Sequence, residues 1–212
     1  IAVTPDGQRS MSTFLGAASL LEPADISREA VQAGAVLFLE GYLFDRDEAK
    51  AAFKIASKYA HEAGRKVALT LSDSFCVDRH REDFLDLILN DIDVLFCNEF
   101  ELQSLYQTSY EESLEQLRSD CEFGAVTRDK RGSVVINGHD LVHIEPEPVD
   151  WVIDATGAGD QYAAGFLYGF TRGMAIEHCG RLGSMSASEV ITHVGPRPLV
   201  QLSTLIPEHL RS

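Results

Sequence analysis

The chain has 212 residues, of which 45% are hydrophobic and 24% are charged, a mix typical of a globular protein and unlike a disordered or fibrous chain. No stretch approaches the ~18 uninterrupted apolar residues that a membrane helix needs, which argues against a membrane partner. The formal net charge of −15 argues against nucleic acid as a partner, because an acidic surface repels phosphate.

The cysteines lack the spacing of a disulfide framework or a zinc site, so we expect four free thiols: Cys76, Cys97, Cys121 and Cys179. Free thiols and the absence of a signal peptide predict a cytoplasmic location. The chain opens at Ile1 on a turn-like segment, which predicts that its amino-terminal part is incomplete.

Short apolar runs alternate with helical patterns along the chain. Strands are expected at residues 36–39, 67–71, 94–97 and 124–127, and a hairpin at 133–144 around Asn137-Gly138. Helices are expected at residues 46–63, 81–89, 99–106, 111–119, from 158 onward, 175–191 and 203–210. Asp45 is the expected N-cap of the first helix, and Gly64 its stop.

Strands that alternate with helices predict parallel pairing and an α/β sandwich. The chain has no internal repeat, and no linker rich in proline or glycine divides it. We therefore expect a single domain over residues 1–212.

Ligands of open α/β sheets bind beyond the carboxyl ends of the strands. Polar residues stand at these expected ends: Glu40, Asp73, Asn98, Glu99, Glu101, Thr127 and Asp154. Polar strand ends are common at protein surfaces, so this pattern makes a site plausible without specifying its chemistry.

The most specific motif is Asp154-Ala155-Thr156-Gly157-Ala158-Gly159-Asp160, which lies between an apolar run and a helix. The two glycines permit a tight turn whose backbone N–H groups point outward at the helix N-terminus. Such donors, with the positive end of the helix dipole, form an anion site. They would stabilise the charge of a phosphoryl group during transfer.

Asp160 falls in the first turn of this helix, where its carboxylate can accept a proton from a substrate hydroxyl. An acidic residue that only complements the helix dipole is the alternative. The complete heptad, followed by Ala163-Ala164-Gly165-Phe166, favours the catalytic interpretation.

With its following helix, the heptad resembles the second sequence motif of the ribokinase-like (PfkB-type) sugar and nucleoside kinases. Asn98-Glu99-Phe100-Glu101 resembles the N-x-x-E motif of that family, and residues 189–198 resemble its adenine-side loop. Residues 4–10 and 72–77 are most similar to bacterial adenosine-kinase-like members. The resemblance covers most of the chain, which looks like the carboxyl-terminal two-thirds of such a kinase.

The resemblance implies a three-layer α/β/α sandwich and ATP-dependent phosphorylation of a primary hydroxyl on adenosine, another nucleoside or a sugar. It implies the following roles: Asp160 as base; Gly157, Ala158 and Gly159 as anion hole; Asn98 and Glu101 for Mg²⁺ and phosphates; Thr127, Gly132 and His193 for the nucleotide; Glu40 for the acceptor; Asp154 and Thr156 for a monovalent cation such as K⁺. A homodimer of the complete protein is also compatible with the resemblance.

Three departures from the family pattern are visible. Ala155 replaces the usual Thr or Ser, and Asp129 replaces a glycine where its carboxylate would repel ATP phosphates. The amino-terminal third, which carries the first strands, the lid and most acceptor contacts, has no counterpart here. We therefore expect the isolated chain to expose apolar surface and to be poorly soluble or paired with another chain.

Two other classes of function compete with a kinase. A degenerate kinase fold that acts as a binding or scaffold protein is favoured by Asp129 and opposed by the intact heptad. A dinucleotide-binding oxidoreductase would need glycine or alanine at position 162, where Tyr162 stands.

Overall fold

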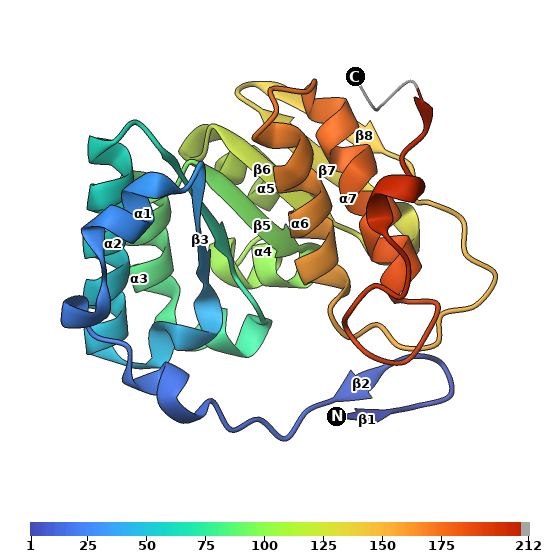
Figure 1. The fold of residues 1–212 in the computed structure, drawn as a ribbon, viewed down its shortest axis with the longest axis horizontal. Helices are drawn as coiled ribbons and strands as arrows, with labels where there is room; N and C mark the ends of the chain where they lie inside the picture. Colours follow the sequence, from blue (N-terminus) through green and yellow to red (C-terminus); the bar gives the residue numbers. More distant parts are fainter. Residues whose placement is uncertain (209–212) are drawn as a thin grey trace. The chain divides into compact units, whose positions relative to one another are not determined.

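The computed structural model of the protein describes residues 1–208, and its main feature is a six-stranded sheet in the order β3-β4-β5-β6-β7-β8 (Figure 1). The strands are β3 (Val36–Glu40), β4 (Lys66–Thr70), β5 (Val94–Asn98), β6 (Phe123–Thr127), β7 (Ser133–Asn137) and β8 (Asp140–Ile144). β4 pairs in parallel with both β3 and β5. The predicted α/β class and the six strands expected between residues 36 and 144 are confirmed. A separate antiparallel pair joins β1 (Ala2–Val3) to β2 (Arg9–Ser10).

The helix expected at 99–106 has those bounds, the helix expected from 158 starts there, and the other helices expected before residue 203 are present with different ends. The α-helices are α1 (Arg28–Ala33), α2 (Asp47–Glu62), α3 (Ser74–Asp91), α4 (Glu99–Tyr106), α5 (Tyr110–Asp120), α6 (Ala158–Phe170) and α7 (Ile176–Val190). The 3₁₀-helices are η1 (Gly16–Leu20), η2 (Pro23–Asp25), η3 (Gly41–Asp45), η4 (Asp129–Arg131) and η5 (Leu202–Thr204). Of the helix expected at 203–210, the structure shows only the short η5, and residues 209 and 210 lie outside the described part.

The chain forms two compact units, each described by itself. The first comprises Ile1–Thr13, Thr127–Val135 and Val142–Ser212, and the second comprises Phe14–Val126 and Ile136–Leu141. The single domain expected from the sequence stays a prediction.

The core of the second unit is built on β4, whose residues Val67, Ala68 and Leu69 are completely buried. Strands buried on both faces are continuously apolar, which explains why this run lacks alternation. Helix α2 contacts β3 and β4, and it buries the apolar residues that recur three or four positions apart: Ala49, Ala52, Phe53, Ala56 and Ala60.

One local prediction in this unit is wrong, because Asp45 pairs with residues of α3 instead of capping α2. Arg46, not Asp45, is the N-cap of α2. The Asp45 carboxylate instead accepts hydrogen bonds from the guanidinium of Arg79 and lies 2.7 Å from Nε2 of His80. The helix expected at 81–89 is confirmed as the part of α3 that follows a kink at His80, where φ is −127°. Long-range pairing of this kind has no signal in local spacing.

Close packing of α6 on α7 organises the first unit. A Cβ on Gly165 would lie 2.3 Å from the Leu182 carbonyl oxygen, and one on Gly169 would lie 3.0 Å from Sγ of Cys179. These two glycines have a packing role, because the lack of a side chain lets α6 approach α7 closely. Gly173 does not share it, because it lies beyond α6 with φ +68° and an added Cβ would meet nothing.

Replacing Gly165 by alanine is expected to lower the free energy of unfolding by about 2 kcal/mol, because overpacking against backbone outweighs the better helix propensity of alanine. Chemical denaturation measures this change. Gly159→Ala is the matched control, since an added Cβ at Gly159 meets no atom within 4 Å. Equal stability of the two variants would contradict the packing argument.

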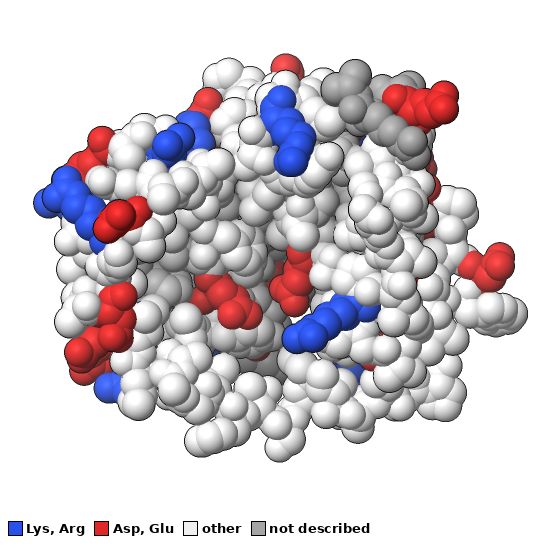
Figure 2. Space-filling model, in the orientation of Figure 1, with Lys and Arg blue, Asp and Glu red and all other residues white. Residues whose placement is uncertain are grey.

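All four cysteines are buried and free, as predicted. None of the described helices is both long and apolar enough to cross a bilayer. On the face drawn in Figure 2, lysine and arginine side chains lie scattered among acidic ones, so this face offers no continuous basic patch to nucleic acid.

Candidate functional site

The turn that leads into α6 is fixed by Asp154, whose side chain is buried. Its Oδ1 accepts hydrogen bonds from the backbone N–H of Thr156 at 2.9 Å and from the Thr156 hydroxyl at 2.5 Å. Its Oδ2 accepts the N–H of Gly195 at 2.9 Å. These hydrogen bonds hold the pKa of Asp154 below its usual value. The carboxylate therefore stays ionised and fixes the conformation of the turn.

Asp154 does not follow a strand, although the sequence placed it at one. Residues 151–153 have no regular structure, and the Trp151 side chain is 78% exposed. Two other segments of the chain accept hydrogen bonds from the backbone around Asp154 instead. The N–H of Ile153 donates to the Ile191 carbonyl at 2.8 Å, and the N–H of Ala155 donates to the Gly7 carbonyl at 3.2 Å.

Gly157 is the N-cap of α6 with φ +80°, the left-handed region that glycine adopts without strain. A Cβ at this position would also lie 2.6 Å from Cβ of Pro196. Ala158 donates its N–H to the Ala155 carbonyl at 3.3 Å. Among the described residues, nothing accepts the N–H groups of Gly157 and Gly159, and the side-chain position of Gly159 faces open space. This open turn fits the backbone donors that a phosphoryl group needs.

Asp160 lies in the first turn of α6 and is exposed, with no hydrogen-bond partner in the described part of the chain. Partial removal of water by the surrounding protein raises the pKa of its carboxyl group, and the positive charge of Arg9 acts in the opposite direction. A carboxylate with no partner and a raised pKa is suited to accept a proton.

Arg9 is a site residue that the sequence interpretation missed. It lies in β2, and its charge lowers the pKa of both Asp154 and Asp160. The separation of about 150 positions hides this proximity. One indication of a role for Arg9 was present in the sequence, since residues 4–10 resemble a segment of the bacterial adenosine-kinase-like members.

The residues of the first unit that were expected to bind the nucleotide lie in two loops. Thr127 and Gly132 border a tight turn closed by a 2.8 Å bond from the Arg128 N–H to the Gly132 carbonyl. Gly132 has φ +75°, and a Cβ there would collide with the Ile144 carbonyl oxygen. Asp129 itself adopts φ +53°, the conformation that the usual glycine would adopt without strain. His193 lies between α7 and Gly195.

Asn98 and Glu101 lie in the second unit and form a capping box at the start of α4. The Asn98 side chain accepts the N–H of Glu101 at 2.9 Å, and Glu101 accepts the N–H of Asn98 at 2.9 Å. The N-x-x-E spacing therefore has a structural reason of its own. Glu40 ends β3 in the same unit and is exposed.

The described residues contain no cluster of three His, Cys, Asp or Glu side chains that could hold a metal ion. Mg²⁺ is commonly held by one or two carboxylates, water and substrate phosphates, so the residues fit Mg²⁺ that arrives with a nucleotide and do not form a closed cage.

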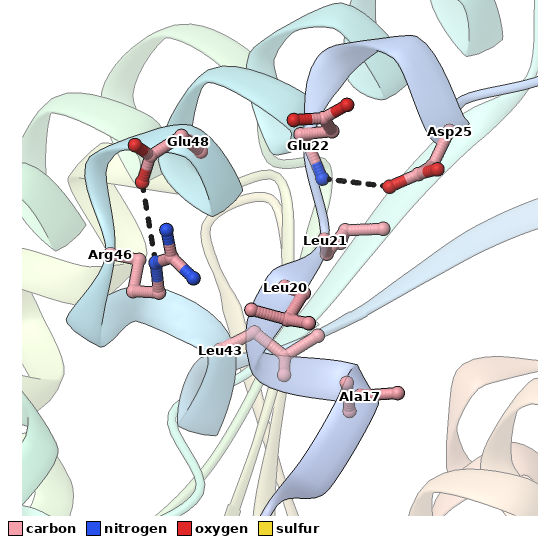
Figure 3. Close-up of a pocket in the computed structure, with 9 residues that line it drawn as sticks. Ala17, Leu20, Leu21, Glu22, Asp25, Leu43, Arg46 and Glu48 are labelled. Atoms are coloured by element: carbon pink, nitrogen blue, oxygen red, sulfur yellow. Dashed lines mark hydrogen bonds and ion pairs between the residues drawn. The ribbon is translucent and has the colours of Figure 1, made fainter.

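A cavity of about 820 Å³ lies in the second unit, and none of the predicted site residues lines it (Figure 3). Leu20, Leu21 and Leu43 lie beside Arg46, which forms an ion pair with Glu48 at 3.3 Å. The sequence does not predict this cavity, because its lining comes from two separated segments, residues 17–25 and 43–48.

Comparison with known proteins gives consistent results. Residues 1–202 match the model of the pfkB family carbohydrate kinases. The crystal structure of an adenosine kinase from Sinorhizobium meliloti is similar with 46% identity and a TM-score of 0.93, over 96% of this chain and 63% of that one. A probable sugar kinase from Rhizobium etli is similar with 45% identity and a TM-score of 0.93, over 96% of this chain and 62% of that one.

A cytidine kinase from Thermococcus kodakarensis is 35% identical over 54% of this chain and 42% of its own length. The chain thus spans under half the length of this relative and under two thirds of the two solved structures. The agreement in fold with the solved structures confirms the predicted ribokinase-like fold.

Proposed function

Since the chain belongs to the pfkB family of carbohydrate kinases, we propose that the protein transfers a phosphoryl group from ATP to the primary hydroxyl of a nucleoside, with adenosine as the first candidate, or of a sugar. The similarity to an adenosine kinase and to a cytidine kinase supports a nucleoside acceptor. A small-molecule acceptor also suits the acidic surface.

The proposed chemistry starts from the open turn. The N–H groups of Gly157 and Gly159, with a smaller part for Ala158, hold the charge of the phosphoryl group at the positive end of α6. Asp160 accepts the proton of the acceptor hydroxyl as the new O–P bond forms and the bond to the ADP oxygen breaks. Arg9 offsets the negative charge that gathers around both carboxylates.

The remaining residues have supporting roles in the proposal. Thr127 and Gly132 border the phosphates, His193 lies at the adenine side, and Glu40 contacts the acceptor. Asn98 and Glu101 organise Mg²⁺ through water, and Mg²⁺ neutralises phosphate charge when bound. Asp154 and Thr156 lie beside a monovalent cation such as K⁺, which predicts higher activity in potassium than in tetramethylammonium salts.

The observation that carries the proposal is the juxtaposition of the open turn with the unpaired carboxylate of Asp160. The test is transfer of radiolabelled phosphate from ATP to adenosine, cytidine and ribose, with titration calorimetry of Mg-ATP beside it. Binding and transfer together support the kinase. Absence of both heat and transfer would contradict it and favour the scaffold interpretation.

Replacing Asp129 by glycine is expected to lower the KM for ATP by about threefold to tenfold. The change removes a carboxylate near the proposed phosphate position and relieves the cost of a non-glycine residue at positive φ, about 1 kcal/mol. Asp129→Asn removes the charge but keeps a side chain at positive φ, so it separates the two effects. A KM that is unchanged in both variants would place the nucleotide phosphates elsewhere.

A further inference from the structure

Glu189 lies in the last turn of α7, where a negative charge opposes the helix dipole. Its side chain is only 10% exposed. Burying a carboxylate at an unfavourable helix end costs free energy, so compensating partners are needed. The structure provides them from the segment that follows the helix.

One oxygen of Glu189 contacts two parts of this segment. Oε1 accepts the N–H of Leu199 at 3.0 Å and lies 3.4 Å from Nε2 of His193. The His193 side chain is 14% exposed. Glu189 Oε2 and His193 Nε2 are buried with no hydrogen-bond partner in the described part of the chain. The two side chains therefore face one another at ion-pair distance.

The segment 192–199 has a second, independent anchor at its middle. Gly195 donates its N–H to Asp154, Pro196 packs over Gly157, and the Pro196 carbonyl accepts from Nε2 of Gln161 at 3.3 Å. These contacts tie the middle of the segment to the turn before α6. Glu189 contacts His193 and Leu199, the latter at the far end of the segment. Loss of Glu189 therefore releases these two residues, while the contacts of Gly195 and Pro196 still hold the turn before α6.

We propose that Glu189 is a positioning residue for the nucleotide: it holds His193 and the far end of the 192–199 segment in the place where the base of ATP binds. This inference rests on the proposed function. It assigns Glu189 to nucleotide binding and not to the transfer step, because the residues of the transfer step are held by the other anchor.

The variants are Glu189→Ala, which removes both contacts, and Glu189→Gln, which keeps an oxygen for the Leu199 N–H. Glu177→Ala is the matched control, because Glu177 is an exposed glutamate of the same helix. Hydrogen exchange of the peptide that covers residues 192–200 measures how firmly the Glu189 contacts hold this segment, and the measurement does not depend on enzyme activity. Steady-state kinetics with ATP and the best acceptor separates KM from kcat.

For Glu189→Ala we expect at least tenfold faster exchange of this peptide and an approximately tenfold higher KM for ATP, with kcat within threefold of the wild-type value. Glu189→Gln should retain most of the protection and raise the KM by about threefold or less, and Glu177→Ala should change neither quantity. A variant that is merely less stable would lose active enzyme without a change in KM.

Unchanged exchange in Glu189→Ala would overturn the inference, and so would faster exchange with an unchanged KM. If Glu189→Ala does not fold, Glu189→Asp replaces it, because the shorter side chain withdraws the carboxylate from Leu199 and His193. Unchanged exchange of the 192–200 peptide in Glu189→Asp, or faster exchange with an unchanged KM for ATP, then overturns the inference. Failure of the proposed function itself is distinguishable, since the wild-type protein would then neither bind Mg-ATP nor transfer phosphate.

Discussion

Replacing Asp160 by asparagine is expected to lower kcat by about 10²–10⁴-fold, the usual contribution of a general base. The affinity for Mg-ATP should change less than about threefold, because the amide occupies nearly the same volume and the turn amides remain. Single-turnover transfer and calorimetric titration of Mg-ATP measure the two quantities. Transfer at the wild-type rate would show that Asp160 is not the base.

The pH dependence gives a second test of the same residue. The base works in its ionised form, so kcat/KM should fall as the pH drops through the pKa of Asp160, which partial loss of water raises above its usual value. Arg9 lowers this pKa, so Arg9→Met should shift the acidic limb to higher pH. Lys130→Met is the control, because it also removes one positive charge and Lys130 is not among the groups that shift the pKa of Asp160. An acidic limb that does not move in Arg9→Met would contradict this account.

Replacing Gly157 by alanine is expected to reduce both stability and activity. The new Cβ collides with Pro196, and the residue must adopt φ +80°, which together cost about 3 kcal/mol. Displacement of an anion-hole donor lowers kcat by about 10²-fold or more. Thermal unfolding and single-turnover transfer measure the two effects.

Gly159→Ala separates the two effects of the Gly157 variant. A Cβ at Gly159 meets no protein atom, so stability should stay within about 0.5 kcal/mol of wild type. The methyl group occupies the open space where the phosphoryl group is proposed to lie, so kcat/KM should fall by at least about tenfold. Full activity of this variant would place the transferred group away from the turn.

Local patterns were sufficient where one segment determines its own structure. The alanine stripe of α2 and the apolar run of β4 are buried as predicted, because period and burial are properties of the segment itself. The Asn137-Gly138 hairpin and the start of α6 at Ala158 follow for the same reason. The family and the position of the open turn were also predictable, since seven consecutive residues carry that motif.

Partners distant in sequence could not be predicted in this way. Asp45 was expected to cap α2 and instead pairs with Arg79 and His80, and residues 151–153 form no strand because other segments bond their backbone. Asn98 and Glu101 had a known motif, yet only the structure shows that they cap a helix.

The sequence alone determined which backbone can form an anion-binding turn and which carboxylate follows it, because both depend on neighbouring residues and on the conformational freedom of glycine. Only the tertiary structure decided that Arg9 acts on Asp160, that Gly195 and Pro196 brace the turn, and that Glu189 holds Leu199. These interactions join residues separated by 10 to about 150 positions. Their geometry arises from the packing of whole elements, which the spacing of residues along one segment does not encode.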